Sequence, residues 1–151
     1  MAHNTMHLPS ELIRDLIDVF ESSNTPFRLI EEDKSKEECF DKLNLLAPFN
    51  SWSYIDWSKV VGQTTWEFDN WEEQSKSVND CLSKLPKSGK VFVLWFNALK
   101  PVLEIEVAVF RLHAMDIFSE CSDTWVYDCA GKFVLECHHD GKLSFYTPGA
   151  T

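Results

Sequence analysis

Three segments of the chain carry apolar residues at the spacing of an amphipathic helix. In residues 8–20, LPSELIRDLIDVF, the apolar side chains share one stripe, and charged residues fill the opposite side. Pro9 suits the first turn of this helix, and the following SSNTP ends it. The same spacing predicts helices in residues 34–49, KSKEECFDKLNLLAPF, and in residues 71–85, WEEQSKSVNDCLSKL.

Four other segments have the patterns of β-strands. Residues 27–32, FRLIEE, predict a short strand, and residues 64–69, TTWEFD, alternate between apolar and polar positions. Residues 90–96, KVFVLWF, are almost continuously apolar, which predicts a central strand covered on both faces. Residues 51–62, SWSYIDWSKVVG, predict a strand that leads into a short turn.

Residues 100–115, KPVLEIEVAVFRLHAM, fit both periodicities. Apolar residues at helical spacing begin at Leu103, whereas LEIEV alternates as a strand does. Because proline is common in the first turn of a helix, Pro101 favours a helix. On a helix Glu104 and Glu106 would lie about 200° apart, so this interpretation excludes a paired-carboxylate site there.

Three short β-rich runs, TWVYD, KFVLECH and KLSFY, follow one another near the end of the sequence. Only CAG and HDG separate them, which predicts a three-stranded antiparallel meander. Asp140-Gly141 is a strong signal for a two-residue hairpin turn, which would set Glu136 opposite Phe145. One face of the meander would then carry Trp125, Tyr127, Val134, Glu136, His138, Leu143 and Phe145.

The pattern as a whole predicts an α+β fold, with a mainly antiparallel sheet of four to six strands and helices packed on it. A chain of 151 residues is long enough for one domain with a substantial core, and no internal repeat or linker divides it. We therefore expect a single domain over residues 1–151.

The charge of the chain restricts the kinds of molecule that it could bind. The net charge is −10, and residues 1–80 hold 16 acidic against 7 basic side chains, whereas residues 81–151 hold 8 against 7. This balance disfavours nucleic acids and anionic membranes, and it favours a basic partner. The chain has five cysteines without a CxxC spacing, no apolar stretch of about 20 residues, and no signal-peptide pattern at the N-terminus. These features predict free thiols and a cytoplasmic location.

The stretch TTWEFDNWEE mixes two tryptophans and a phenylalanine with four carboxylates. A strand-to-helix junction accounts for part of this mixture, because Asp69 or Asn70 can cap the helix and its dipole favours Glu72 and Glu73 in the first turn. The alternative is an adhesive acidic patch with aromatic anchors. On either interpretation Trp66 and Phe68 should lie in or near the core, while Glu67, Asp69, Glu72 and Glu73 should be exposed.

The candidate catalytic groups are few. His138 and His139 should point to opposite faces of a strand, so we expect neither a metal site nor a cofactor site there. No glycine-rich phosphate loop, GxSxG or HExxH motif is present, which disfavours an enzyme. Glu136 is costly on an apolar face unless it meets water, an internal cation such as Arg111, or a partner.

Several motifs together resemble the immunity proteins of bacterial contact-dependent growth inhibition. These are YIDWSKVVG followed by TTW and NW, the strand LWFNALKPVLE, and the closing DIFSECSDTWVYD and FVLECHHDGKLSF. They cover roughly residues 51–146. The resemblance implies a small inhibitor that binds the C-terminal toxin domain of an effector, often a nuclease with a basic groove, and an acidic inhibitor suits such a groove.

The candidate partner-binding residues on this hypothesis belong to the junction and the meander: Glu67, Asp69, Trp71, Glu72, Glu73, Glu136 and Asp140. Two alternatives remain open at this point. One is a hydrolase-like enzyme that uses His138 and Glu136, and the other is a general acidic adaptor for several proteins. The oligomeric state and the strand order are not predicted.

Overall fold

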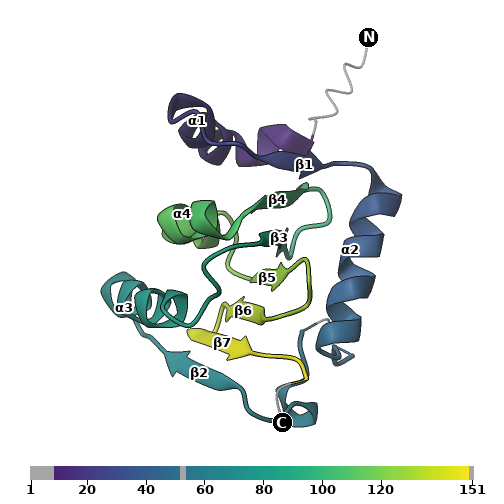
Figure 1. The fold of residues 1–151 in the computed structure, drawn as a ribbon, viewed down its shortest axis with the longest axis vertical. Helices are drawn as coiled ribbons and strands as arrows, with labels where there is room; N and C mark the ends of the chain where they lie inside the picture. Colours follow the sequence, from purple (N-terminus) through teal and green to yellow (C-terminus); the bar gives the residue numbers. More distant parts are fainter. Residues whose placement is uncertain (1–8, 52–53, 150–151) are drawn as a thin grey trace.

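A seven-stranded sheet forms the centre of the protein, as a computed structural model that describes residues 9–51 and 54–149 shows (Figure 1). Its order is β1-β4-β3-β5-β6-β7-β2, and every neighbouring pair is antiparallel. The strands are β1 (Arg28–Ile30), β2 (Thr64–Glu67), β3 (Lys90–Trp95), β4 (Val102–Glu106), β5 (Thr124–Asp128), β6 (Val134–His138) and β7 (Lys142–Tyr146).

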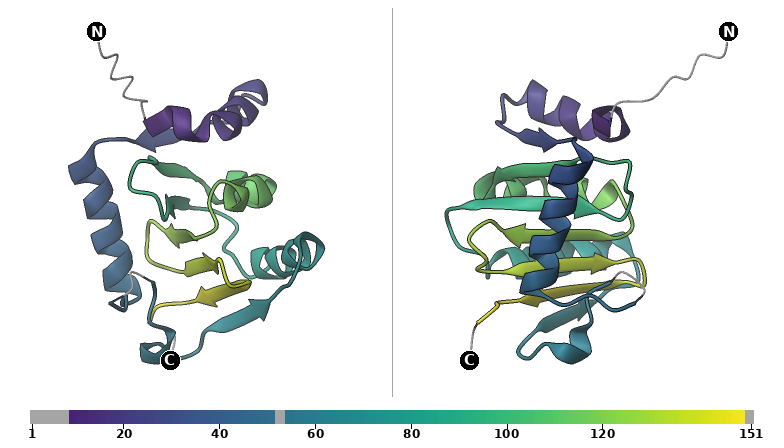
Figure 2. Two further views of the ribbon diagram at one scale, coloured as in Figure 1. Left: turned by 180° about the vertical axis from the view of Figure 1, so that it is seen from behind. Right: turned by 90° about the vertical axis from the view of Figure 1, so that its right-hand side faces the viewer.

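Helices cover both faces of this sheet. On one face lie α1 (Arg14–Ser22), which follows the 3-10 turn η1 (Pro9–Ile13), α3 (Trp71–Leu82) and α4 (Val107–Ser119). The other face is crossed by α2 (Asp33–Leu46), as Figure 2 shows in its right-hand view. Each face has its own cluster of buried apolar side chains, and β3 contributes to both, as its continuous apolar sequence predicts.

The α+β class and the C-terminal meander are confirmed, because β5, β6 and β7 are adjacent and antiparallel. The sheet has seven strands rather than the four to six expected. One source of the difference is the segment after Pro101, where the prediction of a continuous helix is wrong. Val102–Glu106 is strand β4, paired with both β1 and β3, and the helix α4 begins only at Val107.

The alternation in LEIEV was the better signal in this segment. Leu103 and Ile105 are buried on the face of α1, α3 and α4, and Val102 is buried on the face of α2. Glu104 and Glu106 therefore share one side of a strand, contrary to the prediction. Glu104 lies 3.2 Å from the Arg28 guanidinium and 3.9 Å from the Lys90 ammonium, so it belongs to a cross-strand charge cluster.

The predicted hairpin turn is also wrong in its register. His138 pairs with Lys142 and Glu136 pairs with Ser144, so three residues rather than two connect β6 to β7. Only Gly141 of these three has a positive φ, +87°. The shift by one residue moves Leu143 and Phe145 to the face of α3 and α4.

In the β5–β6 pair, Trp125 lies opposite Glu136. Residues 51–62 form no regular strand where they are described. Ile55 makes an isolated bridge with Phe49, and η2 (Trp57–Lys59) is a single 3-10 turn. Trp52 and Ser53, which belonged to the predicted strand, lie outside the described residues.

Candidate functional site

The junction between β2 and α3 has the predicted strand-to-helix geometry. Asn70 is the N-cap residue, and its side-chain oxygen accepts a hydrogen bond from the Glu73 amide at 2.9 Å. The Glu73 carboxylate in turn accepts one from the Asp69 amide at 2.8 Å. Local helix capping therefore explains Asn70 and Glu73, and the helix dipole favours Glu72 in the first turn. Neither effect gives a role to Glu67 or Asp69.

The side chains of the junction divide as expected. Trp66 and Phe68 are half-buried and pack against the core on the face of α3. The four carboxylates Glu67, Asp69, Glu72 and Glu73 are all exposed. Trp71, the first residue of α3, is 63 % accessible to water. Exposed tryptophan next to carboxylates is the composition expected of a contact surface, since indole rings are enriched at binding hot spots.

The junction and the β6–β7 hairpin meet at one end of the sheet. The Phe68 amide donates to the Gly141 carbonyl at 2.9 Å, and Glu67 lies opposite Lys142 in the β2–β7 pair. Asp140 is therefore beside the junction, although it follows Glu73 by 67 positions in the sequence. We call this surface the acidic edge, and it comprises Glu67, Asp69, Trp71, Glu72, Glu73 and Asp140.

Glu136, the remaining predicted contact residue, lies inside the protein. Only 4 % of it is exposed, and its carboxylate accepts three N–H groups. The indoles of Trp57 and Trp125 donate at 2.8 Å each, and the Ile55 amide donates at 3.0 Å. These bonds satisfy the buried charge and tie the segment around η2 to the sheet.

The expected internal cation for Glu136 is not Arg111. The Arg111 guanidinium donates to the carbonyls of Leu85 and Pro86 instead. A carboxylate that already accepts three hydrogen bonds is also poorly placed to take a proton from a substrate, which disfavours the hydrolase-like alternative.

The two histidines of the hairpin are side by side, contrary to the prediction that they face apart. The centres of their rings are 4.2 Å apart, because His139 belongs to the three-residue loop and no longer follows the alternation of β6. His139 Nδ1 lies 3.0 Å from Oδ1 of the buried Asp123, and His138 Nδ1 lies 2.8 Å from Oδ1 of Asp140.

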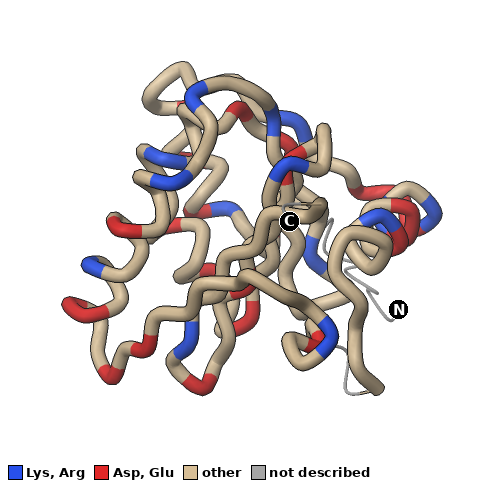
Figure 3. Tube along the Cα trace, turned by 60° about the horizontal axis from the view of Figure 1, so that its bottom comes forward, with Lys and Arg blue, Asp and Glu red and all other residues tan. Residues whose placement is uncertain are grey.

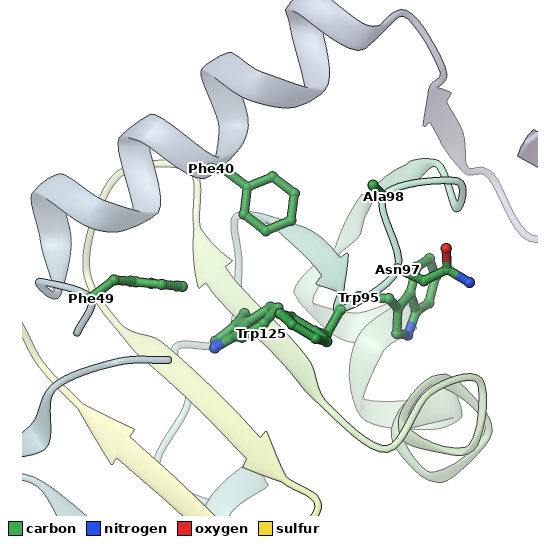
Figure 4. Close-up of a pocket in the computed structure, with 7 residues that line it drawn as sticks. Phe40, Phe49, Trp95, Asn97, Ala98 and Trp125 are labelled. Atoms are coloured by element: carbon green, nitrogen blue, oxygen red, sulfur yellow. The ribbon is translucent and has the colours of Figure 1, made fainter. Parts of the chain in front are cut away.

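An apolar cavity of about 370 Å³ opens between α2 and the same end of the sheet (Figure 4). Phe40 and Phe49 project toward Trp125 in this view, and the loop after β3 closes the other side. That loop is held by the buried ammonium of Lys36, which donates to the Ala98 carbonyl at 2.7 Å. No local sequence pattern predicts this cavity, because its walls come from four separate segments.

Charge is distributed more evenly in space than in the sequence. Acidic and basic positions are interspersed along the trace in Figure 3. Basic residues also adjoin the acidic edge, since Lys142 lies 3.9 Å from Asp140. The difference between the two halves of the sequence therefore does not correspond to one wholly acidic side of the molecule.

A comparison with known protein families shows to which family the chain belongs. A sequence model described as CdiI immunity protein EcoliA0-like matches residues 16–146 of the chain. The chain belongs to this CdiI immunity protein family. The match begins within α1, so it extends well beyond the 51–146 span over which the motifs were recognised. Among curated proteins, no sequence matches the chain.

As a CdiI immunity protein, the chain neutralises a toxin of contact-dependent growth inhibition by binding it. The family implies a non-catalytic inhibitor, which agrees with the scarcity of catalytic motifs in the sequence. The acidic edge lies within the matched residues. No helix in residues 9–51 and 54–149 is long and apolar enough to cross a membrane.

Proposed function

We propose that this immunity protein inhibits a nuclease toxin domain by covering its basic substrate groove with the acidic edge. The observation that carries the proposal is the convergence of two predicted sites at one end of the sheet. The junction contributes Glu67, Asp69 and Glu72, and the hairpin contributes Asp140. A nuclease groove that binds phosphates presents Lys and Arg, to which these carboxylates are complementary.

Trp71 supplies the apolar part of this contact. Its exposed indole, at the first position of α3, stands next to Glu72 and Glu73. Buried aromatic anchors usually carry most of the binding energy, and the charges around them mainly set the rate of association. The proposal therefore assigns affinity to Trp71, and assigns orientation and rate to the carboxylates.

Glu136 supports this surface from within. Its hydrogen bonds to Trp57 and Ile55 hold the segment around η2 against β6, the strand that leads into the hairpin. Of the sequence-predicted contact residues, Glu136 is thus the one whose contribution to binding would be indirect. The proposed setting is the cytoplasm, where the toxin would meet the inhibitor, and nucleic acids and membranes are not among the proposed partners.

Two charge-matched variants test the proposal. Glu67→Gln, Asp69→Asn and Glu72→Gln together remove three charges from the acidic edge and leave the Glu73 cap bond intact. Glu37→Gln, Glu38→Gln and Asp41→Asn remove three exposed charges from α2. Both variants change the net charge from −10 to −7, so they differ only in where the charge is lost.

The association rate with the toxin domain is the quantity to measure. We expect the edge variant to associate about tenfold more slowly than wild type at low salt, because local charge steers the encounter. The α2 variant should remain near the wild-type rate, and both should unfold at the wild-type temperature. High salt should slow wild type toward the edge variant, since screening acts over about 8 Å at physiological ionic strength. Equal rates for the two variants would place the contact elsewhere.

A further inference from the structure

Three potential metal ligands converge where the β6–β7 hairpin meets the loop before β5. One ligand atom from each of Asp123, His138 and His139 can be chosen so that all three lie within 4.8 Å of one another. Asp123 comes from the loop after α4, and the histidines come from the end of β6 and the hairpin. The topology thus brings together residues that lie 15 and 16 positions apart in the sequence.

We infer that Asp123, His138 and His139 form a binding site for one Zn²⁺ ion. Two imidazoles and one carboxylate are a ligand set that zinc accepts, with Zn–N and Zn–O distances of about 2.0–2.2 Å. Two ligand atoms at that distance in a tetrahedral site lie about 3.3 Å apart. His139 Nδ1 and Asp123 Oδ1 are already 3.0 Å apart, so this pair needs almost no rearrangement.

The charge of Asp123 also favours a Zn²⁺ ion at this site. Its carboxylate is buried, with 4 % of the residue exposed, and its partners are Tyr54 and His139. Among the described residues, no Lys or Arg forms an ion pair with it. A buried carboxylate without a full counter-charge is costly, and a divalent cation at this position would supply that charge.

Neighbouring groups hold the ligands in place. The Tyr54 ring packs edge-on against His138 with centroids 4.5 Å apart, and its hydroxyl donates to Asp123 Oδ2 at 3.3 Å. Asp140 lies 2.8 Å from the Nδ1 atom of His138 and restricts the orientation of that ring. Such outer partners are a regular feature of histidine metal sites, where they fix the ring and raise its basicity.

Space remains for a further ligand of the metal. His138 and His139 line a cavity of about 440 Å³, whose walls also include Tyr54, Trp57 and Lys142. Three protein ligands leave one tetrahedral position open, and a water molecule from this cavity would occupy it. Because Gly141 of the same hairpin contacts Phe68, the ion would also stiffen the hairpin beside the acidic edge.

Calorimetric titration of the metal-free protein with ZnCl₂ tests the inference. The parent for all titrations carries His3→Ala and His7→Ala, so that only His113, His138 and His139 remain. We expect one Zn²⁺ per chain and no binding of MgCl₂, because Mg²⁺ prefers oxygen ligands. His139→Ala should weaken Zn²⁺ binding at least about tenfold, and Asp140→Asn should weaken it by about tenfold through the orientation of His138.

Two controls separate the site from other donors. Cys129→Ser removes an exposed thiol and should leave Zn²⁺ binding unchanged. The His139 side chain is 52 % exposed, so its replacement should not unfold the protein, and circular dichroism checks this. Should it unfold, the imidazole NMR signals of the parent decide, because one equivalent of Zn²⁺ should shift His138 and His139 but not His113. Unchanged His138 and His139 signals, or wild-type affinity in folded His139→Ala, would overturn the site.

Discussion

Glu136 shows how a single carboxylate can be stabilised inside an apolar face. Its charge meets two indole N–H groups and one backbone amide, all within 3.0 Å. Hydrogen bonds to a charged group contribute about 1.5–3 kcal/mol each on mutation, and a donor left without an acceptor adds a further cost. The residue therefore acts as a structural centre that joins Trp57, Trp125 and Ile55.

Replacement of Glu136 by glutamine should destabilise the fold. The amide NH₂ group would face at least one of the three donors, so we expect a loss of about 2 kcal/mol in the free energy of unfolding. Urea unfolding followed by tryptophan fluorescence measures this loss, and the exposed Glu37→Gln is the matched control with no expected change. A Glu136→Gln protein as stable as the control would show that these bonds contribute little.

Cys81 gives a second test at the level of one side chain. It is fully buried in α3 against the sheet, and burial raises the pKa of its thiol from 9.0 to about 12. At pH 8 its thiolate fraction is then roughly a thousandfold below that of an ordinary thiol, so alkylation of Cys81 in the folded protein should be correspondingly slow. Mass spectrometry after a short iodoacetamide pulse should find Cys81 modified only in denaturant.

The same pKa shift makes stability depend on pH. The folded state holds the Cys81 proton more tightly than the unfolded state, so its contribution is complete below pH 9 and is lost as the pH rises toward 12. Cys81→Ala should reduce the slope of unfolding free energy against pH in this window by roughly 1 kcal/mol per pH unit. Equal slopes for the two proteins would contradict the burial of this thiol.

At the scale of elements, the contact between β2 and the hairpin depends on one glycine. Gly141 has a φ of +87°, and a Cβ atom there would clash with the Phe68 carbonyl oxygen. Gly62 has a similar φ of +89°, but a Cβ atom there would meet nothing within 4 Å. A substitution would therefore strain the backbone at both glycines, but only at Gly141 would the new side chain also clash with Phe68.

Alanine at the two glycines separates strain from packing. Gly62→Ala should cost about 1 kcal/mol of unfolding free energy, from the left-handed conformation alone. Gly141→Ala should cost about 3 kcal/mol or more, because β2 must also move away from the hairpin. Chemical denaturation of both variants measures the difference. Similar costs would show that β2 and the hairpin do not depend on this close approach.

The sequence predicted the helices and strands better than it predicted which strands pair with one another. Helical and alternating periods located α1, α2, α3, β3 and the meander, because each pattern is a property of neighbouring residues. At β4 two local signals conflicted, and pairing with β1 and β3, which no local window contains, decided the outcome. The hairpin was misjudged because Asp140-Gly141 suits loops of two or three residues, and a change of one residue reverses every face.

In the candidate site, too, local sequence patterns predicted which side chains are exposed but not which distant residues lie together. Exposure of Glu67, Asp69, Glu72 and Glu73 followed from the junction itself and was predicted correctly. The neighbourhood of Asp140 and the junction depends on the pairing of β2 with β7, which joins residues 75 to 81 positions apart in the sequence. The partners of Glu136 and the meeting of Asp123 with His139 depend on pairings of the same kind.

At the scale of the whole molecule, the sheet places the acidic edge, the apolar cavity and the histidine cluster at one end. The ends of β2, β3 and β6 and the starts of β5 and β7 meet there, because every neighbouring pair of strands is antiparallel. Helices cover both faces of the sheet, so this end offers the loops from which contact surfaces are usually built.

The function of the whole molecule is to neutralise a toxin by binding it. The direct measurement is the growth of cells that produce the cognate toxin domain, with and without this immunity protein. We expect viable counts equal to those of toxin-free cells when the two are produced together, and a stable complex on co-purification. Full killing of cells in which the folded immunity protein accumulates at or above the amount of toxin would show that this protein does not neutralise that toxin.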